Sequence, residues 1–256
     1  MSLVDVNTFV GAHPHRHVPH PEAGILARVL EREQVDGAWV GYLPSAFADD
    51  VVAENDALFA ELAPHSERLL PAPVVRPDRP GWEAELARCA AIGAPVIRAY
   101  PEHWGMIPGD RALTALGDAC AEARLPLVLT VQLEDHARRD WPGAPADLGA
   151  AAIAKLMRGA RAVHVVVTAA AGPLVEETTA MLSAGERSRL WWDISWIAGP
   201  PRDDLARLFA SLGADRFLYG SQWPLRLTQT PRANLDLLPA PLRAAPLATV
   251  EDLDAA

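Results

Sequence analysis

The chain has 256 residues, of which 50% are hydrophobic, and a formal net charge of −10 at pH 7. This length suits a single α/β domain that buries one large core. The acidic balance argues against nucleic acid or an anionic membrane as a partner, because surfaces that bind phosphates need clustered Lys and Arg. The two cysteines, Cys89 and Cys120, each lie in an Ala-rich helical stretch, so the chain lacks a disulfide or zinc–thiolate framework.

Neither the N-terminus nor the longest apolar stretch indicates secretion or membrane insertion. The first residues, MSLVD, have no basic region leading into an apolar one, as a signal peptide would. The stretch AVHVVVTAAAGPLV (162–175) is too short for a membrane span and contains Gly172 and Pro173. We therefore expect a cytoplasmic protein with no membrane partner.

Eight short runs rich in Val, Leu and Ile recur along the chain, separated by longer amphipathic segments. Nearly continuous hydrophobicity in such runs is typical of parallel strands that are buried on both faces. In chain order, the predicted strands cover residues 3–9, 37–43, 68–75, 94–100, 126–131, 162–168, 189–195 and 216–221.

The segments between these runs carry apolar residues at helical spacing. Pro21 and Pro201 stand at predicted first turns, and Gly93 and Gly213 stand where helices would end. Strand and helix alternating eight times predict an α/β fold, a (β/α)8 or TIM barrel, as a single domain over residues 1–256. The clearest helical segments are 24–34, 54–63, 83–93, 112–123 and 203–213, and residues 231–256 are expected to form a last helix and, from about residue 247, a loose tail.

In this fold the active site lies at the carboxyl ends of the strands and in the loops that follow them. Polar and aromatic residues gather at these positions, which makes them the candidates for a functional site. They are Asn7, Arg98, Tyr100, Thr130, Gln132, Glu134, Asp135, His136, Thr168, Asp193, Ser195, Trp196, Ser221, Gln222, Trp223 and Arg226.

Two segments resemble signature motifs of a known family. Residues 5–11 read D-x-N-x-F-x-G and resemble the D-x-H-x-H-x-G signature of the amidohydrolase-related, metal-dependent hydrolases. The segment DRFLYGSQWP (215–224) resembles the motif that closes the barrel in that family, and the likeness covers nearly the whole chain. The resemblance implies a TIM barrel with hydrolase activity.

A smaller group within that family is more similar still. It shares the patterns seen here as DVNTFVGAHPHR and RAYPEHWG, and its Glu-Asp-x-x-Arg motif is matched by Glu134, Asp135 and Arg138. Trp104 departs from the group, which tends to carry His at that position. If that His is catalytic in the group, the departure bears on activity here.

The resemblance also implies a metal site, which this chain does not match. In the family, histidines on strands one, five and six and an aspartate on strand eight hold a divalent metal that activates a bound water. None of the residues at these positions is an imidazole or a carboxylate, and their side chains offer no charge to compensate a dication. We therefore predict neither a metal at this position nor another cofactor. The residues concerned are Asn7, Phe9, Thr130, Thr168 and Gln222.

A cluster of histidines after the first strand has two interpretations. On an extended segment, imidazoles two residues apart lie on one side and could share an ion, which would make a rebuilt metal site. However, Pro14 and Pro19 interrupt any strand, and polar side chains in a loop are ordinarily solvated. The cluster comprises His13, His15, His17 and His20.

The charged residues at the mouth of the predicted barrel also leave alternatives open. Arg98 either pairs internally with Asp193 or Glu134, or clamps the carboxylate of a ligand. Asp135, beside Glu134 and His136, either activates a water as a general base or begins a charged loop. The tryptophans on the same face either pack or line a pocket for an apolar or planar ligand; these are Trp104, Trp141, Trp196 and Trp223.

Two functional hypotheses follow. The first is a metal-independent hydrolase of a small carboxylated lactone, ester or amide, with Asp135, Asp193 and Glu134 as catalytic residues. The second is a pseudoenzyme that binds a ligand or a partner, with a mouth plugged by Phe9 and Trp223, whereas the enzyme requires an open pocket and an unpaired Arg98. Either could form a homo-oligomer. The predicted substrate-binding residues are Arg98, Asn7, Thr130, Gln222, Trp223 and Trp104.

Overall fold

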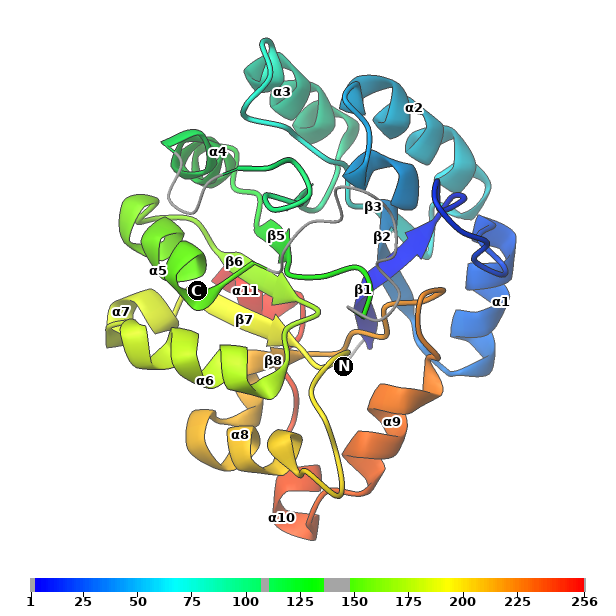
Figure 1. Cartoon of the computed structure of the whole chain (residues 1–256). Coiled ribbons are helices and arrows are strands. Elements are labelled where there is room, and N and C mark those ends of the chain that lie inside the picture. The colour runs from blue at the N-terminus through cyan, green and yellow to red at the C-terminus, as the bar shows by residue number, and fades with distance from the viewer. Residues whose placement is uncertain (1–2, 107–110, 136–147, 256) are drawn as a thin grey trace.

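The computed structural model describes residues 3–106, 111–135 and 148–255. Within these ranges, eight strands form a ring that is surrounded by helices (Figure 1). Each strand overlaps one of the eight predicted runs, and most are shorter. The strands are β1 (Val4–Val10), β2 (Gly37–Tyr42), β3 (Leu69–Pro71), β4 (Ile97–Ala99), β5 (Leu127–Thr130), β6 (Val165–Thr168), β7 (Leu190–Asp193) and β8 (Phe217–Leu218).

The helices follow the strands in the expected alternation, and the five clearest predicted segments correspond to α1, α2, α3, α4 and α8. No helix in the described ranges is long and apolar enough to cross a membrane. In chain order the helices are α1 (Ala23–Arg32), α2 (Val51–Leu62), α3 (Trp82–Ile92), α4 (Arg111–Glu122), α5 (Ala150–Gly159), α6 (Gly172–Met181), α7 (Ala184–Arg187), α8 (Asp204–Leu212), α9 (Gln229–Asp236), α10 (Ala240–Arg243) and α11 (Glu251–Ala255).

All neighbouring strands pair in parallel, in the order β1-β2-β3 and β4-β5-β6-β7-β8. Backbone hydrogen bonds join the two sheets at both seams. At one seam the N–H of Arg98 donates to the carbonyl of Pro73 (2.8 Å), and at the other the N–H of Phe9 donates to the carbonyl of Trp223 (2.7 Å). The predicted (β/α)8 fold is confirmed, and its strand ends converge on one mouth.

The interior of the ring is layered because side chains two residues apart on a strand point to the same side. Along β4 and the residues on either side of it, Val96 packs in a lower apolar cluster with Val128 and Trp191, Arg98 lies above it, and Tyr100 packs in an upper apolar cluster with Phe9. A polar layer is thus enclosed between two apolar layers. Every group in that layer must find its partner inside the protein.

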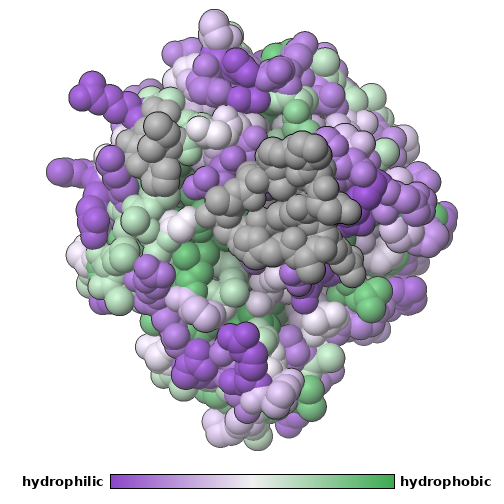
Figure 2. Space-filling view, in the orientation of Figure 1, coloured by the Kyte–Doolittle hydropathy of each residue, from purple (hydrophilic) through white to green (hydrophobic). Residues whose placement is uncertain are grey.

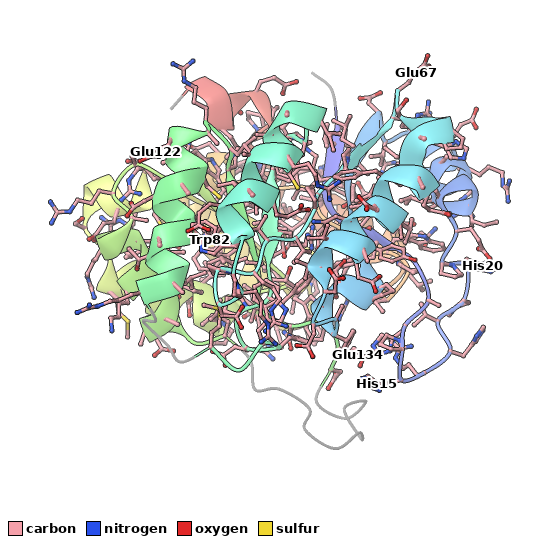
Figure 3. All side chains as sticks on the ribbon, turned by 90° about the horizontal axis from the view of Figure 1, so that it is seen from above. His15, His20, Glu67, Trp82, Glu122 and Glu134 are labelled. Carbon is pink, nitrogen blue, oxygen red and sulfur yellow. The ribbon has the colours of Figure 1, made fainter. Side chains whose placement is uncertain are left out.

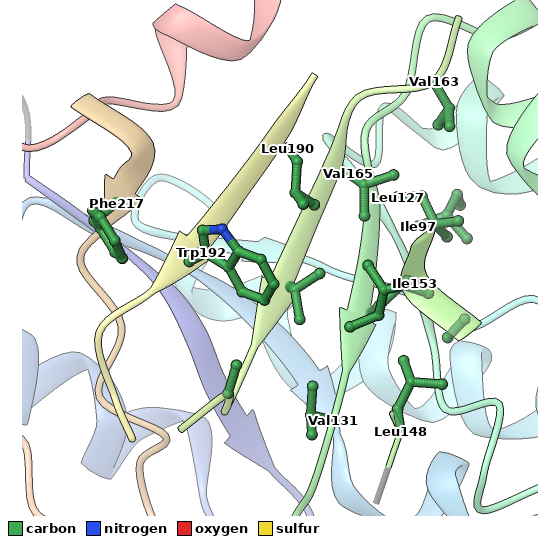
Figure 4. Packing of buried hydrophobic residues seen from close by; sticks show 14 of the residues in the cluster. Ile97, Leu127, Val131, Leu148, Ile153, Val163, Val165, Leu190, Trp192 and Phe217 are labelled. Carbon is green, nitrogen blue, oxygen red and sulfur yellow. The ribbon is translucent and has the colours of Figure 1, made fainter. Parts of the chain in front are cut away.

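The outward-facing side chains of β5 to β8 bind the helices to the ring. Leu127, Val165, Leu190 and Trp192 belong to one large cluster that also includes Ile153 of α5 (Figure 4). Each side chain of this kind that is fully buried stabilises the fold by about 1.5–3 kcal/mol. This packing gives the polar layer and the mouth a rigid frame.

The C-terminal segment closes the opposite end of the ring from the mouth (Figure 3). We expected a loose tail from about residue 247, but the N–H of Ala248 donates to the carbonyl of Phe217 (2.9 Å) and Leu253 is only 1% exposed. Leu253 packs against the lower apolar layer, beside Val128 and Trp191. Burial of these apolar side chains offsets the entropy lost on ordering the tail, which a Pro- and Ala-rich sequence does not reveal.

Candidate functional site

The centre of the polar layer is Arg98, which is fully buried. Its Nη1 donates to Asn7 Oδ1 and to Thr130 Oγ1, each at 3.1 Å, and its Nη2 donates to the carbonyl of Val6 at 3.1 Å. The guanidinium also lies over the ring of Phe9, with Cζ 4.8 Å from the ring centroid. Strands β1, β4 and β5 are thereby linked through a single cation.

Asp193 is the buried carboxylate nearest this network. Its Oδ2 accepts from Asn7 Nδ2 (2.8 Å) and its Oδ1 accepts from the backbone N–H of Ala169 (2.8 Å). A Cβ at position 220 would lie 2.5 Å from Oδ2, so Gly220 is required for the end of β8 to come this close. Burial raises the pKa of Asp193, an effect that the hydrogen bonds and the charge of Arg98 only partly offset.

A second buried carboxylate, Asp5, lies before the irregularity in β1 that separates it from Thr8. Its Oδ1 accepts the backbone N–H groups of Asn7 (3.1 Å) and Ser221 (3.0 Å). Burial raises the pKa of Asp5 to about 7, and repulsion from Asp193 acts in the same direction. One guanidinium and two carboxyl groups are therefore buried near one another, and the Asp5 carboxyl is about half protonated near pH 7.

The layer above closes this interior. Phe9 and Tyr100 are both fully buried, and no atom of Arg98 is exposed among the described residues. The sequence left two roles open for Arg98, namely an internal pair with Asp193 or Glu134 and a clamp on a ligand. In the structure its direct partners are neutral oxygens instead, and the open pocket with an unpaired Arg98 is not seen in the part of the chain described.

The interior does not fit a divalent metal. The oxygens of Asn7 and Thr130 already accept from Arg98, and Thr168 Oγ1 lies 3.1 Å from Thr130 Oγ1. A guanidinium in contact with these oxygens would repel a dication, and hard or borderline metals in proteins prefer carboxylate or imidazole donors. Across the described ranges, no three His, Cys, Asp or Glu side chains are grouped closely enough to hold a metal, and this includes the histidines after β1.

A second polar cluster lies at the rim of the mouth, around Glu134 just after β5. The side chain of Glu134 is only 1% exposed; Oε2 lies 3.5 Å from Nε2 of His13, and Oε1 accepts from Nε of Arg16. Burial alone would raise the pKa of Glu134, but the interactions with His13 and Arg16 outweigh it and lower the pKa below its usual value. Glu134 is thus an ionised anchor for the loop after β1, which brings His15 to the same face (Figure 3).

Beside this anchor is a cleft of about 440 Å³, at the ends of β5, β7 and β8. This volume suits a small ligand. The face onto which it opens carries hydrophilic residues around its edge and apolar residues nearer the centre (Figure 2). The side chains that line the cleft are Arg16, Leu133, Glu134, Asp135, Trp196, Pro224, Leu225, Arg226, Leu227 and Thr230.

One wall of the cleft is held by Gln222. Its Oε1 accepts from the indole N–H of Trp196, and its Nε2 donates to the carbonyl of Gln132 (2.9 Å). Its backbone φ is +62°, a left-handed conformation that is uncommon outside glycine. The guanidinium of Arg226 lies over the ring of Trp196, with Cζ 4.4 Å from the ring centroid. Strands β5, β7 and β8 are therefore coupled at the cleft.

The predicted site residues divide between these two places. Asn7, Thr130, Asp193 and Arg98 lie together in the closed interior, whereas Glu134 and Asp135 line the cleft and Gln222 supports its wall. The ring of Trp223 stacks on that of His20, with centroids 6.5 Å apart, and the ring centroid of Trp104 lies 5.1 Å from Cζ of Arg76. Neither tryptophan is among the described residues that line the cleft. His136, Arg138 and Trp141 lie outside the described residues.

Sequence reasoning missed two of the charged groups. Asp5 precedes an irregularity in β1, between Asp5 and Thr8, so strand alternation does not predict that its carboxyl is buried near Asn7. Arg16 lies within the histidine cluster, and no spacing signal in the sequence indicates that it meets Glu134, 118 positions away.

A cleft of about 420 Å³ at the amino ends of β7 and β8 is remote from all these groups.

Comparison with known proteins supports the fold and the family pattern. A sequence profile of the amidohydrolase family matches residues 37–255. A search of curated proteins finds no match.

Three solved structures show similar folds. A 2,6-dihydroxybenzoate decarboxylase from Rhizobium has 12% identity and a TM-score of 0.67, with 100% of this chain and 99% of the other covered. A probable 2-pyrone-4,6-dicarboxylic acid hydrolase from Acinetobacter baumannii with citric acid bound has 13% identity and a TM-score of 0.61, with 99% and 90% covered. A dihydroxybenzoic acid decarboxylase from Polaromonas sp. JS666 with bound manganese has 11% identity and a TM-score of 0.65, with 94% and 93% covered.

Proposed function

Because this chain belongs to the amidohydrolase family, we propose that it is a metal-independent hydrolase of a small carboxylated lactone, ester or amide, acting in the cytoplasm. The observation that carries the proposal is the cleft at the carboxyl ends of β5, β7 and β8, where arginines and carboxylates face one volume of about 440 Å³. Similar folds bind small carboxylates, such as citric acid in the Acinetobacter protein. The active site of this fold lies at the same end of the barrel.

The two arginines of the cleft fit an anionic substrate. A guanidinium recognises a carboxylate through two parallel hydrogen bonds, and Arg226 presents its planar group from the wall formed by Trp196. Arg16 is held by Glu134 on the other side of the cleft, where it can stabilise negative charge that develops on the reacting carbonyl oxygen. Glu134 itself is a poor base, because the same contacts lower its pKa.

Asp135 is the proposed general base. It is exposed and lines the cleft, so it can contact a water molecule beside a bound substrate. The water oxygen attacks the carbonyl carbon while its proton passes to Asp135. The C–O or C–N bond then breaks, and the leaving oxygen or nitrogen takes that proton back from the carboxyl group. An ester or amide gives a carboxylic acid and an alcohol or an amine, and a lactone gives a single hydroxy acid.

A panel of carboxylated lactones, esters and amides, offered to chelator-treated protein, tests this proposal. We expect turnover with at least one class, and Asp135→Asn should reduce kcat by about 10²–10⁴-fold, as removal of a general base does. Asp118→Asn is the matched control, because Asp118 is an exposed aspartate on α4, outside the residues that line the cleft. Turnover that survives Asp135→Asn would refute the assignment of the base.

The second candidate function is ligand binding without catalysis, as in a pseudoenzyme. The closed interior favours it, because Arg98 donates hydrogen bonds to Asn7 and to Thr130 and is fully buried beneath Phe9. Quenching of tryptophan fluorescence by carboxylates that lack a scissile bond would measure binding through Trp196. Saturable binding combined with no turnover across the whole panel would favour this candidate over the hydrolase.

A further inference from the structure

The charge of the buried Arg98 must be balanced inside the ring, away from the cleft. Arg98 interacts electrostatically with Asp193 and with Asp5, and all three are fully buried. Burying an unpaired charge is costly, so a barrel that encloses these groups must compensate them locally. Asn7 lies between two of them, since its Oδ1 accepts from Arg98 (3.1 Å) and its Nδ2 donates to Asp193 (2.8 Å).

We infer that the guanidinium of Arg98 is the fixed central cation of this barrel, standing where the family resemblance would put a divalent metal, and that Asp193 is its counter-ion through Asn7. A monocation with five donors needs oxygen acceptors rather than anionic ligands, so neutral side chains suffice at Asn7 and Thr130, which accept from Arg98, and at Thr168, which contacts Thr130.

The geometry favours a guanidinium over other cations. One planar group reaches Asn7, Thr130 and the carbonyl of Val6 at once, so it satisfies acceptors on two strands and stacks over the ring of Phe9. Lysine would supply the charge from a single point and could not span the same acceptors. The arrangement therefore depends on both the charge and the shape of Arg98.

A double-mutant cycle tests the pairing of charges. We would compare Arg98→Met, Asp193→Asn and the double variant by urea denaturation at pH 7. Removal of the cation leaves Asp193 buried without compensation, so the loss of stability caused by Arg98→Met should fall to less than half when Asp193 is already Asn. If Arg98→Met yields no folded protein, recovery of folded protein in the double variant supports the inference. Equal losses in both backgrounds, or no recovery, would overturn it.

Metal binding provides a second test, which needs neither interior variant. Zn²⁺ or Mn²⁺ would be offered to the triple variant His15→Ala/His17→Ala/His20→Ala, which removes exposed rim histidines and leaves the interior untouched. We expect no stoichiometric metal after dialysis and no change in the unfolding midpoint. One equivalent of metal that raises the midpoint would show that the interior accepts a dication and would overturn the inference.

Discussion

The buried carboxyl of Asp5 makes the stability of the fold depend on pH. Its pKa is about 7 in the folded protein, against 3.8 when the side chain is unperturbed, so the folded state retains a proton that the unfolded chain has lost. This contribution to stability is complete below about pH 4 and is lost as the pH rises through 7. A rise of about three pKa units, each worth about 1.4 kcal/mol, gives a cost of up to about 4 kcal/mol for ionising Asp5 in place.

Asp5→Asn removes this cost, because an amide of nearly the same shape stays neutral at every pH. Relative to the wild type, the variant should gain free energy of unfolding as the pH rises from 4.5 to 8, by up to about 4 kcal/mol. Urea denaturation at pH 4.5, 6 and 8 measures the difference, and the exposed Asp118→Asn serves as the control. A difference between Asp5→Asn and the wild type that is the same at all three pH values would refute the reasoning.

Three other changes test the tail, the wall of the cleft and the rim. Leu253→Ala should lower the free energy of unfolding by about 2–4 kcal/mol, because the side chain is buried beneath the ring, and a loss under about 0.5 kcal/mol in urea would contradict that packing. Gln222→Ala removes the acceptor of the Trp196 indole N–H, so the NMR signal of that proton should move and exchange faster; an unchanged signal would count against the link. Glu134→Gln weakens the hold on Arg16, so amide hydrogen exchange in the loop after β1 should accelerate, and equal protection in variant and wild type would argue against the anchor.

The layered interior could be predicted from the sequence in large part. Val96, Arg98 and Tyr100 alternate along one strand, so a barrel assignment alone places a charge between two apolar layers. Asn7 and Asp193 are both among the residues predicted at the mouth of the barrel, but the sequence does not predict the hydrogen bond between them. Strand alternation does not predict that Phe9 and Tyr100 pack over the guanidinium of Arg98 and exclude it from the mouth.

The cleft was harder to predict because it depends on contacts between distant loops. The position of Glu134 after β5 predicts a catalytic carboxylate, yet its contacts with His13 and Arg16, in the loop after β1, lower its pKa and keep it ionised. A carboxylate that is free to take a proton and one that is held ionised look the same in a sequence. The two can be distinguished only once the loop after β1 is seen to fold back over the mouth.

The identity of residue 7 connects the family pattern to the chemistry of the interior. The side-chain amide of Asn7 donates to Asp193 and accepts from Arg98 at the same time. A carboxylate at this position could not donate and would repel Asp193, while a protonated imidazole could not accept and would repel Arg98. Asn7, at the position where the family resemblance places a metal-binding histidine, and the buried Arg98 of β4 are therefore parts of one arrangement, because the amide of Asn7 can satisfy Arg98 and Asp193 together.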